Sequence, residues 1–127
     1  MKRLLTAAVA LIVTAGAALA DPVEGTWQTQ VDEGNFAFVE IKPCGDKFCG
    51  TISRTFNSDG EWKSGNIGKN LVWDMTAKGN GDYGDGKIWQ PSKDKVYKSK
   101  MSLNGDRLNV SGCIGPICKK QTWARVK

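Results

Sequence analysis

The sequence predicts an all-β fold, an antiparallel up-and-down barrel or sandwich of about eight short strands. Strand-favouring residues recur in short runs between turn residues, and no helical periodicity appears after residue 20. The chain then begins with Gly25-Thr26-Trp27 and ends with Trp123-Ala124-Arg125 shortly before its last residue. A tryptophan on the first strand and an arginine on the last favour a closed barrel, with the guanidinium lying across the indole face. We assign a barrel-closing structural role to Gly25, Trp27, Trp123 and Arg125.

The first twenty residues have the features of a secretory signal peptide. Lys2 and Arg3 precede an apolar run over 4–16, and Ala18-Leu19-Ala20 matches a cleavage site. We therefore predict a cleaved signal peptide over 1–20, a single barrel domain over 21–127 and a periplasmic or secreted location; a retained helix is the alternative. The apolar run is too short to predict stable membrane insertion. Loss of Lys2 and Arg3 would lower the net charge from +5 to +3. This charge predicts no nucleic-acid binding and at most weak attraction to an anionic envelope surface.

The strands are predicted from runs of β-branched and aromatic residues bounded by turn signals. Asn104-Gly105 is a two-residue hairpin signal. Lysines on the run that precedes it predict a solvated strand face. Two stretches lack strand patterns, a polar link over 53–70 and a Gly-rich, mobile segment over 79–86. The predicted strands cover 26–31, 36–42, 47–54, 71–75 (a strand or one helical turn), 87–90, 95–103, 107–113 and 119–126.

Four cysteines occur as two copies of a C-x4-C spacing, each with turn residues inside the interval. A four-residue hairpin loop would place its flanking residues opposite each other. We therefore predict the disulfides Cys44–Cys49 and Cys113–Cys118, although spacing leaves the other two connectivities open. Zinc binding by the four cysteines is disfavoured because exported thiols oxidise.

The residues that common catalytic and metal sites need are sparse. The chain has no histidine, the usual general base and metal ligand. A carboxylate pair is the remaining route to hydrolysis, but the acidic residues stand mostly in turn contexts. A calcium loop starting at Asn80 fails its template, since Pro91 stands where a glutamate is needed. We predict a protein that is not an enzyme and needs neither cofactor nor metal. The carboxylates considered for a hydrolase are Glu40, Asp74, Asp82 and Asp85.

Six fragments in a fixed order resemble the DUF2147 family of exported bacterial proteins, which has no settled function. The resemblance implies a lipocalin-like antiparallel barrel and, with it, a small-molecule cavity. Gln90-Pro91 stands where the family often has Asp-Pro, so no ligand preference is carried over. The fragments are Gly25-Thr26-Trp27, Phe38-Val39-Glu40-Ile41, Cys49-Gly50-Thr51-Ile52, the run from Gly84 to Pro91, the run from Leu108 to Gly115, and Thr122-Trp123-Ala124-Arg125-Val126.

The five tryptophans and four phenylalanines either fill the barrel or surround a ligand. The interior of an eight-stranded barrel is just wide enough to be filled by side chains or to hold one small ligand. With the resemblance, we predict non-catalytic binding of a small hydrophobic or amphipathic molecule, with Tyr97 and Ser99 supplying polar contacts. The alternative is a solid barrel that acts as a protein-interaction or enzyme-inhibitor module through rim loops 54–70 and 78–86, anchored by Trp62 and Tyr83. The predicted cavity residues are Phe38, Phe48, Ile52, Ile88, Tyr97, Ser99 and Met101.

Overall fold

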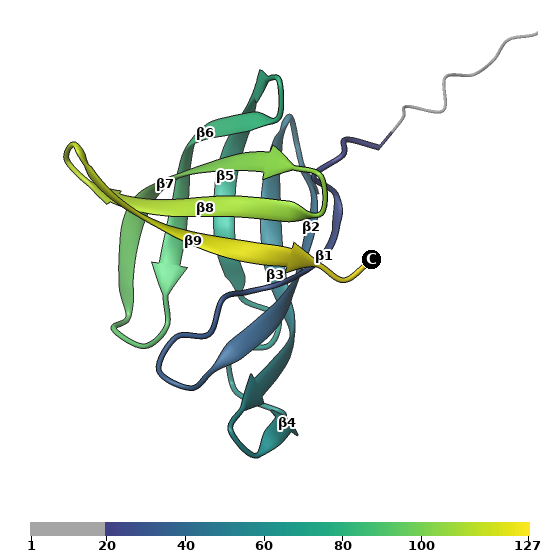
Figure 1. Cartoon of the computed structure of the whole chain (residues 1–127), viewed down its shortest axis with the longest axis vertical. Coiled ribbons are helices and arrows are strands. Elements are labelled where there is room, and N and C mark those ends of the chain that lie inside the picture. Colours follow the sequence, from purple (N-terminus) through teal and green to yellow (C-terminus); the bar gives the residue numbers. More distant parts are fainter. Residues whose placement is uncertain (1–19) are drawn as a thin grey trace, which may run out of the picture.

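The computed structural model describes residues 20–127, so the predicted signal peptide lies outside the described residues apart from Ala20. All regular structure in the described part is β-strand (Figure 1). No helix there could cross a membrane. The strands are β1 (Gly25–Gln28), β2 (Phe36–Cys44), β3 (Lys47–Asn57), β4 (Gly60–Trp62), β5 (Asn70–Gly79), β6 (Asp82–Gln90), β7 (Lys95–Asn104), β8 (Arg107–Ile114) and β9 (Ile117–Arg125).

Eight of these strands close into an antiparallel barrel. The sheet order runs β2-β1-β9-β8-β7-β6-β5-β3-β4, and β2 also pairs with β3. That extra pairing closes the sheet, while β4 pairs only with β3 and extends from one end (Figure 1). The predicted all-β barrel is therefore confirmed. Closure removes the exposed sheet edges that would otherwise invite aggregation.

Both predicted disulfides are confirmed, Cys44–Cys49 and Cys113–Cys118. Cys113 and Cys118 stand directly opposite each other in the β8–β9 register, as predicted. Cys49 is paired in the sheet with Lys42, so its bond to Cys44 is diagonal. The predicted four-residue loops were wrong, since each hairpin turns through two residues. Direct and diagonal neighbours on one face are both close enough to bridge.

The Gly-rich segment is a β-hairpin rather than the predicted mobile loop. Strand β6 begins at Asp82, and the alternative for 71–75 is resolved as strand β5. Gly79 and Gly81 take positive φ values of 92° and 83° at the turn, a conformation that favours glycine. Gly86 lies where a Cβ would come within 2.5 Å of the sulfur of Met75. These glycines therefore serve a tight turn and a close packing contact.

One end of the barrel is closed by aromatic packing where the first strand, β1, meets the last strand, β9. Trp27 and Trp123 are fully buried, and the Arg125 guanidinium carbon lies 4.3 Å from the centre of a Trp27 ring. The Trp27 indole N–H donates to the carbonyl of Val23 at 2.9 Å. Gly25 fits because a Cβ there would lie 2.6 Å from the Lys127 carbonyl oxygen. This closed end leaves the opposite end as the entrance to the interior.

Tyr83 ties the segment before β1 to the closed end. Its hydroxyl donates to the Asp21 carboxylate, and its side chain is buried. Burial, followed by the bond to Asp21, raises the pKa of Tyr83 well above its usual range. The neutral phenol is thus favoured in the folded state, so this stabilisation is present below the unfolded pKa of about 10 and is lost above it.

We predict that Tyr83 makes the stability of the barrel sensitive to alkali. Above pH ~10, the free energy of unfolding of the wild type should fall relative to Tyr83→Phe, by up to about 1.4 kcal/mol per pH unit. Denaturant unfolding of both proteins at pH 8 to 11 checks this. The comparison cancels lysine titration, which the two proteins share. A difference between them that does not change with pH would contradict the prediction.

Candidate functional site

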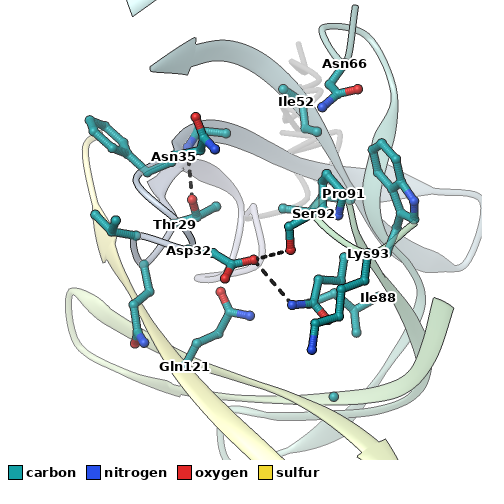
Figure 2. Close-up of a pocket in the computed structure, with 18 of the residues that line it drawn as sticks. Thr29, Asp32, Asn35, Ile52, Asn66, Ile88, Pro91, Ser92, Lys93 and Gln121 are labelled. Atoms are coloured by element: carbon teal, nitrogen blue, oxygen red, sulfur yellow. Dashed lines mark hydrogen bonds between the residues drawn. The ribbon is translucent and has the colours of Figure 1, made fainter. Parts of the chain in front are cut away.

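A cavity of about 630 Å³ opens at the end of the barrel opposite the closed end, and Figure 2 shows residues that line it. Its walls come from the barrel strands. Its mouth is formed by the β1–β2 loop, the segment after β4, the β6–β7 turn and the tip of the β8–β9 hairpin. Small-molecule sites typically have volumes of about 300–1,000 Å³. The interior is therefore hollow at one end and packed at the other.

The inner walls of the cavity are mainly apolar. Ala37, Ile52, Leu71 and Ile88 line it and are buried, and Tyr97 lies beside them half-buried. Alternation of side chains between the two faces turns the residues of β2, β3, β6 and β7 inward, whereas Leu71 is buried next to buried Val72 at a register shift between β3 and β5. Gly112 on β8 leaves space there, since a Cβ would lie 3.4 Å from a methyl carbon of Ile88. This part of the cavity suits an apolar group.

The mouth is polar and is spanned by a hydrogen-bonded bridge. The Asp32 carboxylate accepts from the Ser92 hydroxyl at 2.8 Å and from the Gln90 amide at 3.3 Å (Figure 2). These bonds link the β1–β2 loop to the β6–β7 turn, although the residues are about sixty positions apart in sequence. Lys93 and Lys119 also line the mouth, and neither forms an ion pair with a carboxylate of the described residues.

The structure brings three of the seven predicted cavity residues together and separates the other four. Ile52, Ile88 and Tyr97 line the cavity. Ser99 and Met101 are buried on β7, closer to the packed end. The Ser99 hydroxyl has no hydrogen-bond partner among the described residues. Neither residue is among those that line the cavity, so any ligand contact by them stays a prediction.

Phe38 and Phe48 lie elsewhere, which corrects their predicted positions. The buried residues of β2 are Ala37, Val39 and Ile41, so the alternation turns Phe38 to the outside. There its ring packs 4.9 Å from that of Phe56. Phe48 packs edge-on against Tyr83 near the closed end, with ring centroids 5.8 Å apart.

An exposed ion pair joins β4 to the outer face of β3, where Phe38 and Phe56 pack together. Arg54 donates from Nε to Glu61 at 2.7 Å and lies over the rings of Phe38 and Phe56. The contact with Arg54 lowers the pKa of Glu61, and the contact with Glu61 raises the pKa of Arg54. Both side chains are about half exposed, so the pair contributes little to stability. It orients β4 beside the cavity mouth.

The two loops predicted to form one rim lie at opposite ends of the barrel. In an up-and-down barrel, successive connections alternate between ends, and Figure 1 shows β4 at the bottom and the β5–β6 hairpin at the top. Trp62 lines the cavity mouth and is 47% exposed, whereas Tyr83 is only 4% exposed. The interaction module built on loops 54–70 and 78–86 therefore lacks a shared surface.

The four carboxylates considered for hydrolysis do not line the cavity. Asp85 instead pairs with Lys78, which lowers the pKa of that carboxyl. Across residues 20–127, no cluster of three or more histidine, cysteine, aspartate or glutamate side chains could hold a metal ion. The chemistry that the described site offers is therefore apolar burial combined with hydrogen bonding and positive charge at the mouth.

The polar bridge at the mouth was missed by sequence reasoning. Asp32 and Ser92 stand in stretches that read as ordinary turns, Asp32-Glu33-Gly34 and Pro91-Ser92. Each could be predicted to lie in a loop. Their hydrogen bond forms only because closure of the barrel brings the two loops together, and no local sequence pattern predicts that contact.

Comparison with solved structures finds the same fold in another bacterial protein. The structure described as "Protein HP1028 from the human pathogen Helicobacter pylori belongs to the lipocalin family" is 21% identical to this chain, with a TM-score of 0.64. The match covers 82% of each chain. At this identity the likeness shows a lipocalin-like fold. No curated protein matches the chain. The model of the family described as "Uncharacterized protein conserved in bacteria (DUF2147)" matches residues 25–125, and the chain belongs to this family.

Proposed function

We propose that this protein binds a small hydrophobic or amphipathic molecule in the barrel cavity and performs no catalysis. The observation that carries the proposal is the cavity of about 630 Å³, with buried apolar walls and a polar mouth. The lipocalin-like fold supports it, because an eight-stranded barrel of this kind can hold one small ligand. The apolar part of the ligand would lie against Ile52, Leu71 and Ile88.

The affinity would come mainly from burial of apolar ligand surface, at roughly 25 cal/mol per Å² before the costs of ordering. A polar or anionic end would remain at the mouth, where Lys93 and Lys119 have no carboxylate partner among the described residues. Lys119 occupies the same face of β9 as buried Trp123 but is exposed, which places it at the mouth above the packed interior. This arrangement favours an amphipathic ligand that enters with its apolar end first.

We further propose that binding takes place in the periplasm or outside the cell. The two disulfides support an oxidising compartment, and the features of residues 1–20 support export. A carrier in such a compartment would keep an apolar molecule out of water between the sites where it is released and used.

Native mass spectrometry of the protein purified from its own host tests the ligand proposal. We expect a discrete adduct of a few hundred daltons that organic extraction removes, since a cavity of this size holds one small molecule. Protein that never carries an adduct, and that also fails to bind apolar probes in solution, would contradict the proposal. The same spectrum reports whether the chain begins at Asp21 and whether two disulfides lower its mass by about four hydrogens.

A further inference from the structure

The tip of the β8–β9 hairpin exposes two large apolar side chains. Ile114 and Ile117 are 70% and 73% exposed and flank the turn Gly115-Pro116. The Cys113–Cys118 disulfide joins the two strands directly behind them. Figure 1 shows this hairpin projecting beyond the neighbouring strands. The isoleucines thus stand on a braced hairpin that extends past the mouth of the barrel, where burial within the barrel does not reach them.

Other exposed apolar residues gather at the same end. Besides the two isoleucines, the large hydrophobics exposed among residues 20–127 are Val31, Trp62, Ile67, Val96 and Val126. All but Val126 lie in the connections at the mouth end of the barrel or at the ends of the strands next to those connections. The β2–β3 hairpin at the closed end is a matched comparison, because it also carries a disulfide and a two-residue turn. Its turn is Gly45-Asp46, so a braced hairpin does not itself require an apolar tip.

Positive charge continues from this tip along the outside of the barrel. No acidic residue follows Asp106 in the sequence. Lys100 and Lys120 pair with the same residue of β8, and Lys98 stands directly opposite Lys87. None of these four lysines forms an ion pair among the described residues. Like charges placed opposite each other destabilise a sheet, so the fold alone does not account for this arrangement.

We propose that this surface docks on a lipid bilayer that carries anionic headgroups. We call it the hairpin face and define it as Ile114 and Ile117 with Lys98, Lys100 and Lys120. Aliphatic side chains at a protruding tip can enter the headgroup–acyl boundary, and nearby lysines are attracted to anionic lipids. Because the apolar residues stand on separate loop tips around a hollow mouth, they suit a deformable lipid surface better than a flat protein partner.

Docking in this orientation brings the cavity mouth to the bilayer surface. Ile114 and Ile117 line that mouth as well as forming the tip. An apolar molecule could then pass between bilayer and barrel with little exposure to water. Docking is a property of the outer surface and does not require a ligand in the cavity, so it can hold or fail independently of the ligand proposal.

Vesicle flotation tests the proposal. The disulfide-bonded protein is mixed with vesicles of phosphatidylcholine alone, or of phosphatidylcholine with phosphatidylglycerol. We expect binding to the mixed vesicles, weaker binding as salt rises, and little binding to phosphatidylcholine alone. Lys98→Gln with Lys100→Gln should weaken binding about 25-fold, at about fivefold per lysine. Ile114→Ser with Ile117→Ser should weaken it about tenfold, and the matching leucine pair should retain it.

Matched controls lie at the closed end. Val126→Ser removes the exposed apolar residue there, and Lys42→Gln with Lys127→Gln removes two exposed lysines; none of these changes should alter vesicle binding. Mass spectrometry gives the N-terminus of the preparation, because residues 4–16 are apolar and would bind lipid wherever they are retained. All variants are compared in the same form, and their melting temperatures check folding. Equal binding of neutral and anionic vesicles, or unchanged binding by both hairpin-face variants, would overturn the proposal.

Discussion

Trp27→Ala should lower the free energy of unfolding by about 3–5 kcal/mol, the largest loss we expect from one substitution. The Trp27 side chain is fully buried, and its ring lies beneath the Arg125 guanidinium. Removing it leaves a cavity at the closed end. It also leaves the Val23 carbonyl without its indole donor and the guanidinium without its aromatic surface. Because a domain of this size is stable by about 5–15 kcal/mol, this loss is a large share of the total.

Denaturant unfolding with both disulfides intact measures this effect. Trp62→Ala is the matched control, because that indole is 47% exposed and its removal should change stability by at most about 0.5 kcal/mol. Trp27→Phe separates the contributions, since it keeps part of the packing and loses the indole hydrogen bond. Its stability should lie between those of Trp27→Ala and the wild type. A loss below about 1 kcal/mol for Trp27→Ala would show that the closed end does not depend on this residue.

Local patterns were sufficient to predict the barrel, because its strands and turns are encoded in short stretches. The run before Asn104-Gly105 forms β7 as predicted, but the turn to β8 is Gly105-Asp106, one residue later than predicted, because Asn104 still pairs with Arg107. The spacing of the cysteines predicted the correct disulfides even though one pair is diagonal. Closure itself needed the two ends of the chain to be considered together, through Trp27 and Arg125.

Which face of a strand points into the barrel was harder to predict where both faces are apolar. In β2, Phe38 and Val39 are both hydrophobic, so alternation alone did not show which side is internal. The structure covers Phe38 from outside with Arg54 and Phe56, which lie across the sheet on β3. A similar problem affected the Gly-rich hairpin, since the need for Gly86 arises from Met75 on the neighbouring strand. The residues in such contacts are well separated in the sequence. The sequence shows that residue 86 is a glycine, but it does not show which side chain packs against that glycine.

Filling the cavity should abolish ligand binding while leaving the barrel folded. Ile88→Trp places a larger side chain on a wall residue that is buried and faces the hollow interior. The added ring occupies space that the ligand would need, so the adduct should be lost and affinity for an apolar probe should fall at least about tenfold. The substitution should cost at most about 1–3 kcal/mol in stability, because overpacking is relieved where the neighbouring space is empty.

Anilinonaphthalene sulfonate is a suitable probe, since it joins an apolar fluorophore to an anionic group and brightens in apolar surroundings. Val96→Trp is the matched control, because Val96 is a β-branched residue on the adjacent strand, 54% exposed and outside the cavity lining. It should bind the probe as the wild type does. The pair Ile114→Ser and Ile117→Ser separates probe bound at the hairpin tip from probe bound at the inner walls. Both isoleucines lie at the cavity mouth and are largely exposed, so their replacement should strongly weaken only binding at the tip. Unchanged probe binding by a folded Ile88→Trp protein would place the ligand outside the barrel and remove the basis for a carrier.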